Sequence, residues 1–206
     1  MITPTPGLTL SAVARGVWRA GSLFLFFVGC TGSSFQLAPI VPTKQQLPYT
    51  AQLRLAELAA YTVEPGVTLR SDPQLQNYVT RPASTPFLSA KQWEQTVLDY
   101  MQARQTFRKV VEKGPADIAM DVRVFVYIDP SVQSEFSHTY IARADASVTD
   151  PHTGGAIANY SGFGKATGQG SKDSKEADEG LTRKSVRAAL NDLFSKIETD
   201  KRLVPL

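Results

Sequence analysis

The stretch Ala116-Asp-Ile-Ala-Met-Asp-Val-Arg-Val-Phe-Val-Tyr-Ile-Asp129 decides the fold of this 206-residue chain. Its even-numbered positions from Ile118 to Ile128 are all apolar, whereas its odd-numbered positions mix charged and aromatic residues. Alternation with a period of two is typical of a β-strand that buries one face. We therefore predict a strand over residues 116–129 whose even-numbered face lies in the core.

Two more strands follow along the chain. Residues 136–149 place Tyr140 and alanines 142, 144 and 146 on one face, and residues 156–165 form a third strand. Asp150-Pro-His-Thr-Gly154-Gly155 has the composition of a turn between them. A meander register that keeps apolar faces together sets large residues opposite small ones on the buried face, and opposite charges on the other. The predicted pairs are Ile128 with Tyr140, Val126 with Ala142, Val124 with Ala144, Val122 with Ala146, Tyr127 with Ile141 and Arg123 with Asp145.

Two helices complete the predicted fold. Ser89-x-x-Gln92 is a capping box, and an apolar stripe that includes Trp93 and Val97 predicts a helix over residues 89–112, ended by Lys113-Gly114-Pro115. Asp173-x-x-Glu176 starts a final helix with apolar residues at Leu181, Val186, Leu190, Leu193 and Ile197. The sequence predicts an α+β fold, a two-layer sandwich in which an antiparallel three- to five-stranded sheet carries two helices on one face.

Residues 51–63 fit two structures. Leu53, Leu55, Ala59 and Tyr61 alternate as in a strand, whereas the segment 56–60 has helical propensity. We favour a strand because Tyr61-Thr-Val63 is β-prone and Pro65-Gly66 then turns the chain. Residues 64–88 contain four prolines and are predicted to be an irregular connection, with a short strand at 67–70.

The N-terminus has the pattern of a secretory signal. Arg15 and Arg19 precede the apolar run Ser22-Leu-Phe-Leu-Phe-Phe-Val-Gly-Cys30, which is too short to span a membrane. Its end resembles the bacterial lipobox, in which the cysteine is lipidated and becomes the first mature residue, although Phe27 stands where leucine is usual. The resemblance implies a palmitate-bearing membrane anchor at Cys30. Two alternatives stay open, namely ordinary secretory cleavage and a cytosolic protein with an unusual apolar N-terminus. We predict a signal peptide at 1–29, a flexible tether at 30–50 and a single α+β periplasmic domain at 51–206.

The charge balance and the residue inventory exclude several function classes. Without residues 1–29 the chain keeps 20 basic and 19 acidic residues and no Lys/Arg run, so it lacks the electrostatic footprint of a nucleic-acid-binding protein. Cys30 is the only cysteine, which leaves no intrachain disulfide or cysteine-based metal site. Glu135-x-x-His138 offers two metal ligands without an evident third, so we interpret it and His152 as polar loop residues. No metal, cofactor or catalytic residue is expected.

Four glycines between the third strand and the final helix, at 162, 164, 168 and 170, invite comparison with a phosphate-binding loop. The spacing fails in detail, because Thr167 stands at the position of the third glycine of a dinucleotide-binding motif and Asn159 at the first glycine of a Walker A motif. We interpret the segment as a flexible glycine linker at the edge of the sheet.

The segment Asp150-x-x-Thr-Gly154 resembles the hairpin of small envelope lipoproteins of proteobacteria. These include curli-secretion-type lipoproteins, the N-terminal domain of the TolB translocation protein and several uncharacterised lipoprotein families. The resemblance covers roughly residues 105–197 and carries no catalytic residues. It implies an accessory domain that faces the periplasm, often in an assembly.

The second face of the sheet is the candidate partner surface. This face carries several charged residues together with Phe125, Tyr127, Ile141 and Phe163. Both predicted helices cover the opposite face, so neither is left to cover this one. The strip is either covered by residues 51–88 or open to a partner or a second copy, since exposed apolar patches usually mark contacts.

Two alternatives concern the function of the protein. We expect a non-enzymatic, lipid-anchored accessory or assembly subunit on the periplasmic face of the outer membrane, a location favoured by Thr31, with an envelope protein partner or self-association. The alternative is a solute-binding auxiliary lipoprotein of a lipid transport system, with a pocket lined by Trp93, Met101 and Tyr140.

Overall fold

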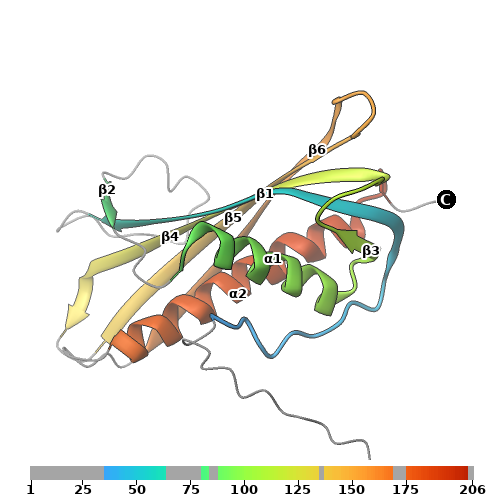
Figure 1. Ribbon diagram of the computed structural model, residues 1–206. Coiled ribbons are helices and arrows are strands. Elements are labelled where there is room, and N and C mark those ends of the chain that lie inside the picture. Colours follow the sequence, from blue (N-terminus) through green and yellow to red (C-terminus); the bar gives the residue numbers. More distant parts are fainter. Residues whose placement is uncertain (1–34, 64–79, 84–87, 135–136, 169–174, 204–206) are drawn as a thin grey trace, which may run out of the picture. The chain divides into compact units, whose positions relative to one another are not determined.

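The computed structural model describes residues 35–63, 80–83, 88–134, 137–168 and 175–203. Within these ranges the order of elements is β1 (Leu47–Val63), β2 (Thr80–Ala83), α1 (Ala90–Arg104), β3 (Phe107–Val111), β4 (Ile118–Ser134), β5 (Ser137–Thr149), β6 (Ala156–Gly168) and α2 (Lys175–Thr199). The strands form one sheet in the order β2-β1-β4-β5-β6, and β3 pairs with β1 (Figure 1). The short strand predicted at 67–70 lies outside the described residues.

The predicted meander of β4, β5 and β6 is confirmed. β4 and β5 pair antiparallel, with Val124 opposite Ala144, Val126 opposite Ala142 and Arg123 opposite Asp145. The turn between β5 and β6 forms as expected, with Gly154 at a φ of +71°, a left-handed conformation that glycine adopts without strain. The Asp150 carboxylate accepts hydrogen bonds from the backbone N–H of His152 at 2.7 Å and from the Thr153 hydroxyl at 2.9 Å, and these bonds hold the pKa of Asp150 below its usual range.

The sheet is mixed, which corrects the prediction of an antiparallel sheet. β1 is the predicted strand of residues 51–63, but it runs parallel to β4, from Ala51 opposite Ile118 to Thr62 opposite Ile128. It also runs parallel to β3. The physical reason is the connection. Parallel neighbours need a crossover, and α1 lies on the path from β1 to β4 and returns the chain to the end where it started. Because β2 and β3 join the edge, the described part of the chain forms a sheet of six strands rather than three to five.

A β-bulge in β1 explains why its apolar residues do not follow one simple alternation. Leu53 pairs with Met120 and Leu55 with Asp121, so Arg54 is one extra residue relative to β4. Before the bulge the odd-numbered Leu53 faces the core, and after it the even-numbered Ala56 does. Tyr61 is therefore directed to the second face of the sheet.

The helix predicted over residues 89–112 is shorter and ends at Arg104. The Ser89 capping box forms, and Gln105 takes a left-handed conformation with φ 60° and donates its N–H to Met101 O. Phe107–Val111 is strand β3 instead, because β-branched and aromatic residues favour a strand and this segment finds a partner in β1. The helical prediction for residues 105–112 was therefore wrong.

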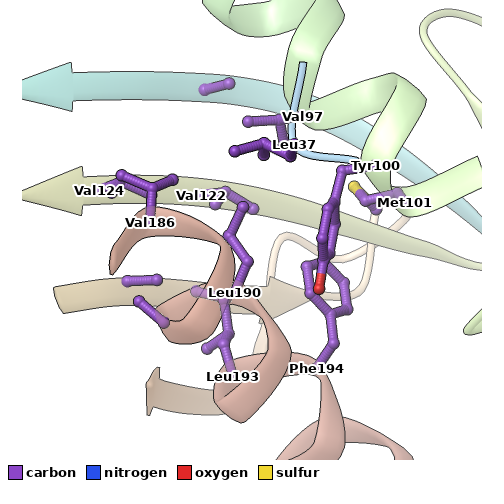
Figure 2. Packing of buried hydrophobic residues seen from close by; sticks show 14 of the residues in the cluster. Leu37, Val97, Tyr100, Met101, Val122, Val124, Val186, Leu190, Leu193 and Phe194 are labelled. Carbon is purple, nitrogen blue, oxygen red and sulfur yellow. The ribbon is translucent and has the colours of Figure 1, made fainter. Parts of the chain in front are cut away.

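Both helices cover the same face of the sheet. α1 lies over β1 and β3, and α2 lies over β5 and β6 (Figure 1). The even-numbered side chains of β4 meet residues of both helices in the core, where Val122, Val124, Val186 and Leu190 are fully buried (Figure 2). Tyr100 of α1 and Phe194 of α2 lie side by side, with ring centroids 5.7 Å apart (Figure 2). The predicted two-layer arrangement fits these observations.

Gly162 and Gly164 belong to strand β6 rather than to a flexible linker. A Cβ atom at Gly162 would lie 2.3 Å from the Ala189 carbonyl oxygen, and one at Gly164 would lie 2.1 Å from the Ser185 carbonyl oxygen. No side chain fits in such a space, so the two glycines allow the backbone of α2 to lie directly on β6. The interpretation of these residues as a linker is corrected accordingly; Gly170 lies outside the described residues.

The ordered domain begins earlier than residue 51. Phe35 and Leu37 are 3% exposed and belong to the main core, and β1 already starts at Leu47. The Phe35 ring packs edge-on against Trp93 at 6.4 Å, and the Arg187 guanidinium donates to the Ala38 carbonyl at 2.8 Å. Residues 35–50 are thus part of the domain and not of the tether predicted over 30–50.

Candidate functional site

The face of the sheet opposite the helices carries an aromatic cluster. Tyr127 and Ile141 are 6% and 3% exposed, and Tyr61, Phe125 and Phe163 pack around them, half-buried. We call these five residues the aromatic cluster. The structure thus brings together all four residues of the predicted strip. It adds Tyr61, which the sequence did not place there because neither the bulge nor the pairing of β1 with β4 was foreseen.

The rings of the aromatic cluster are in direct contact. Tyr61 stacks on Tyr127 with centroids 5.7 Å apart and an interplanar angle of 22°, and it lies 6.3 Å from Phe125. Burial raises the pKa of Tyr127 above its ordinary value. The Lys196 ammonium lies 5.8 Å from the centroid of the Phe163 ring. The role of the cluster as a partner surface stays a prediction, and the burial of Tyr127 and Ile141 leaves the other three members as its accessible part.

Charged residues on the same face pair with one another. Arg54 binds Asp121 at 3.0 Å, and Arg143 binds Asp145 at 2.9 Å. Arg123 lies opposite Asp145 in the register, as predicted, but its ion pair is with Glu57 of β1 at 3.0 Å. At least one residue of each pair lines a shallow hollow of about 270 Å³ that also includes Phe125 and Tyr160. Because the opposite charges are matched, this half of the face is polar without a strong field of one sign.

A groove runs between β1 and the start of α1. Two adjoining hollows, of about 500 and 360 Å³, share Ala56, Glu57 and Ala90 as lining residues. One end of this β1 groove is lined by charged residues such as Lys91, Glu94 and Glu112, and the other by Leu58, Leu88 and Trp93. No signal in the sequence indicated it, since it depends on the position of α1 beside an edge of the sheet.

No hollow among those lined by described residues contains more than one of Trp93, Met101 and Tyr140. Met101 is fully buried and Tyr140 is 4% exposed, and both belong to the packed core. Trp93 is 2% exposed but forms part of the wall of the β1 groove. Its indole Nε1–H is buried and has no hydrogen-bond acceptor among the described residues.

A buried polar network joins α1 to α2, and the sequence did not predict it. Arg104 binds Glu198 through two hydrogen bonds, Nε to Oε1 at 2.8 Å and Nη2 to Oε2 at 3.0 Å. The Thr106 hydroxyl donates to Glu198 at 2.6 Å, and both Arg104 and the Tyr100 hydroxyl donate to the Asn191 side-chain oxygen. Burial raises the pKa of Tyr100 to about 12. The sequence gives one indication of this network, which is that Arg104 and Glu198 each lie next to the apolar stripe of a helix. Because every partner is satisfied within the protein, the network is best explained as a structural clasp.

Other candidate residues are placed as follows. Cys30 and Glu135 lie outside the described residues. His152 sits in the β5–β6 turn, and His138 pairs in register with Gly168. Among the residues that the structure describes, no group of three or more histidine, cysteine or acidic residues is arranged to hold a metal ion. None of the described helices combines the length and the apolar character needed to cross a membrane.

Comparisons with known proteins give no family assignment. The sequence matches no protein-family model and no curated protein. Several solved structures are similar in part, and three of them are described here. A protein of the DUF330 family from Xanthomonas campestris has a TM-score of 0.48 and 11% identity, covering 78% of this chain and 94% of that chain. A protein from Caulobacter crescentus CB15, provisionally described as a lipoprotein, has a TM-score of 0.31 and 13% identity. The match covers 53% of this chain and 76% of that chain.

The third structure, from Helicobacter pylori, is provisionally described as a homolog of a neuraminyllactose-binding hemagglutinin. It has a TM-score of 0.44 and 10% identity, and the match covers 81% of this chain and 95% of that chain. With TM-scores below 0.5, none of the three carries an argument about fold or function.

Proposed function

We propose that this chain is a non-enzymatic lipoprotein that acts as an accessory or assembly subunit in the bacterial cell envelope. Its anchor is a lipid on Cys30, and its location is the periplasmic face of the outer membrane. The observation that carries the proposal is the N-terminal run Ser22–Cys30, a short apolar segment that follows two arginines and ends in the only cysteine of the chain.

Two features of the domain support a binding role, namely that its described charge networks are satisfied internally and that other surfaces remain available for contact. The ion pairs of the second face are matched internally, and the buried Arg104–Glu198 network is saturated by its own partners. Two surfaces in the described part of the chain remain available for contact, namely the outer members of the aromatic cluster, which are apolar, and the β1 groove, which is mixed. Such surfaces suit contact with another molecule better than acid–base chemistry.

The anchor is tested by metabolic labelling in a bacterial host. Labelled palmitate is expected to enter the wild-type protein and not the Cys30→Ser variant, and the wild type is expected to sediment with outer-membrane fractions. The matched control is Ser33→Cys combined with Cys30→Ser, which keeps one cysteine but displaces it from the end of the apolar run. Equal labelling of wild type and Cys30→Ser, or a mature protein that retains its N-terminus, would contradict the anchor.

A second candidate is a solute-binding auxiliary lipoprotein of a lipid transport system. One observation favours it, namely that Trp93 lines a hollow of about 360 Å³. The burial of Met101 and Tyr140 in the packed core weighs against the deeper pocket that a lipid tail needs. Lipid analysis of the purified protein by mass spectrometry distinguishes the two, since stoichiometric lipid that is lost in Trp93→Ala supports the auxiliary role.

A further inference from the structure

Among the described residues, strands pair with the two ends of the outer edge of β1 and leave the stretch between them unpaired. β3 pairs with β1 from Leu47 to Gln52, and β2 pairs with it from Ala60 to Val63. In the part of the chain that the structure describes, no strand pairs with residues 53–59 on this side. A stretch of seven residues spans about 23 Å in an extended strand. Free backbone groups along such an edge are a template for an added strand.

The β1 groove lies along this open stretch. Its two hollows are lined by residues 54–59 of β1 on one side and by residues 88–95, at the start of α1, on the other. The groove therefore offers room beside the edge where an added strand would run, and α1 forms one wall.

The end of the groove at Trp93 is apolar. Leu58, Leu88 and Trp93 line this end. The Trp93 indole N–H is itself buried, so this end of the groove suits an apolar side chain of an added strand.

The other end of the groove is acidic. The charges of Arg54 and Glu57 are used in ion pairs with Asp121 and Arg123. Lys91, Glu94 and Glu112 also line this end, and no ion pair links any of them to another residue within the described ranges. Two carboxylates against one ammonium favour a basic side chain on whatever binds there.

We propose that the β1 groove binds an extended segment of a partner protein that adds as a strand to residues 53–59, with an apolar side chain at Trp93 and a basic one near Glu94 and Glu112. Backbone hydrogen bonds supply affinity and the two ends of the groove supply specificity, as in other cases of β-strand addition. The inference rests on the proposed function in one respect, that an assembly subunit has a protein partner.

Binding is measured with purified full-length Trp18→Phe protein in detergent, where Trp93 is the only tryptophan and its fluorescence reports on the groove. The probe is a hexapeptide of alternating valine and lysine. Controls are the valine–glutamate hexapeptide and a valine–lysine hexapeptide N-methylated at alternate amides. We expect saturable binding of the first and at least about tenfold weaker binding of both controls, because the N-methylated peptide loses backbone donors. The assay does not depend on Cys30, so its failure is distinguishable from failure of the lipid anchor.

Protein variants locate the site. Ala90→Tyr fills the groove from an exposed position and is expected to abolish binding, whereas Ala103→Tyr, on the exposed part of the same helix outside the groove, is expected to leave it unchanged. Glu94→Lys combined with Glu112→Lys is expected to reverse the preference towards the valine–glutamate peptide. The proposal is overturned if neither of the two charged peptides binds. Equal binding of the N-methylated peptide also overturns it, and would assign the groove to an apolar ligand such as a lipid.

Discussion

Val124 and Arg123 are neighbours in the sequence and lie on opposite faces of β4. Val124 is fully buried in the core, whereas the Arg123 side chain is 55% exposed and pairs with an equally exposed Glu57. Val124→Asp places a charge in the core without a partner, which is expected to cost several kcal/mol, a large part of a typical stability of about 5–15 kcal/mol. Arg123→Ala is expected to cost less than about 1 kcal/mol. Denaturant unfolding compares the two, and the reverse ranking would mean that the faces of β4 are assigned wrongly.

Because of Tyr100, the free energy of unfolding is expected to depend on pH in the alkaline range. Burial is the main cause that raises its pKa to about 12 in the folded protein, from an ordinary value of 10.0. Between pH 10 and pH 12 the folded state therefore keeps a proton on Tyr100 that the unfolded state has lost. The contribution of Tyr100 to the free energy of unfolding is complete below about pH 10 and is lost as the pH rises towards 12. The difference in unfolding free energy between wild type and Tyr100→Phe is expected to shrink over this interval. A difference that stays constant with pH would show that Tyr100 titrates normally.

Glu198 is the centre of the clasp between α1 and α2. Arg104 and Glu198 are 7% and 6% exposed, so removing one partner leaves a buried charge without its counter-charge. Glu198→Leu is expected to cost about 3–5 kcal/mol. The double variant Arg104→Met, Glu198→Leu is expected to lose less than Glu198→Leu alone, because no lone charge remains. Denaturant unfolding of the full mutant cycle checks this, and additive losses would indicate that the ion pair does not couple the two helices.

The packing of α2 on β6 depends on glycine, and it is the sharpest test at the level of elements. A Cβ atom at Gly164 would lie 2.1 Å from Ser185 O and 2.4 Å from Ala189 N, so Gly164→Ala forces α2 away from the sheet. We expect a loss of about 3 kcal/mol or more. Gly180→Ala, in α2 with no atom within 4 Å of the new methyl group, is the control, and it is expected to stabilise the helix by up to about 1 kcal/mol. Similar melting temperatures for the two variants would contradict the close approach.

The same elements show what the sequence could predict. The register of β4 and β5 followed from the alternation of valines and alanines, because a slip of one residue would have moved every apolar side chain to the wrong face. The parallel pairing of β1 with β4 could not be found in this way, since it depends on how α1 returns the chain. The end of α1 was misplaced because helical and strand periodicity overlap across residues 105–112. The aromatic cluster was predicted from β4, β5 and β6, whereas Tyr61 and the β1 groove depend on the unforeseen position of β1.

The position of Phe35 limits how far the domain can stand from a lipid anchor. Phe35 is held in the core, with its ring 6.4 Å from Trp93 and 5.5 Å from the Arg183 guanidinium. Four residues separate it from Cys30, and the five Cα-to-Cα steps between the two residues span about 18 Å at most. If Cys30 carries the lipid, the part of the molecule around Arg183 must therefore lie close to the membrane. A tether of the originally predicted length would have allowed any orientation.

An orientation of the whole domain follows and can be measured. Lys184, next to Arg183, is exposed, and so is Thr153 in the β5–β6 turn. Gly164 lies against Ser185, and the eleven residues of strand and turn from there back to Thr153 span roughly 35 Å. Lys184→Cys and Thr153→Cys each supply the only free thiol once Cys30 is lipidated. Energy transfer from a donor dye on that thiol to acceptor-labelled lipid headgroups is expected to be stronger at 184 than at 153. Insertion of about 20 glycine and serine residues between Cys30 and Phe35 is expected to remove the difference, because a flexible linker of that length no longer restricts orientation. Equal transfer at both positions without the insertion would show that the short connection does not orient the domain.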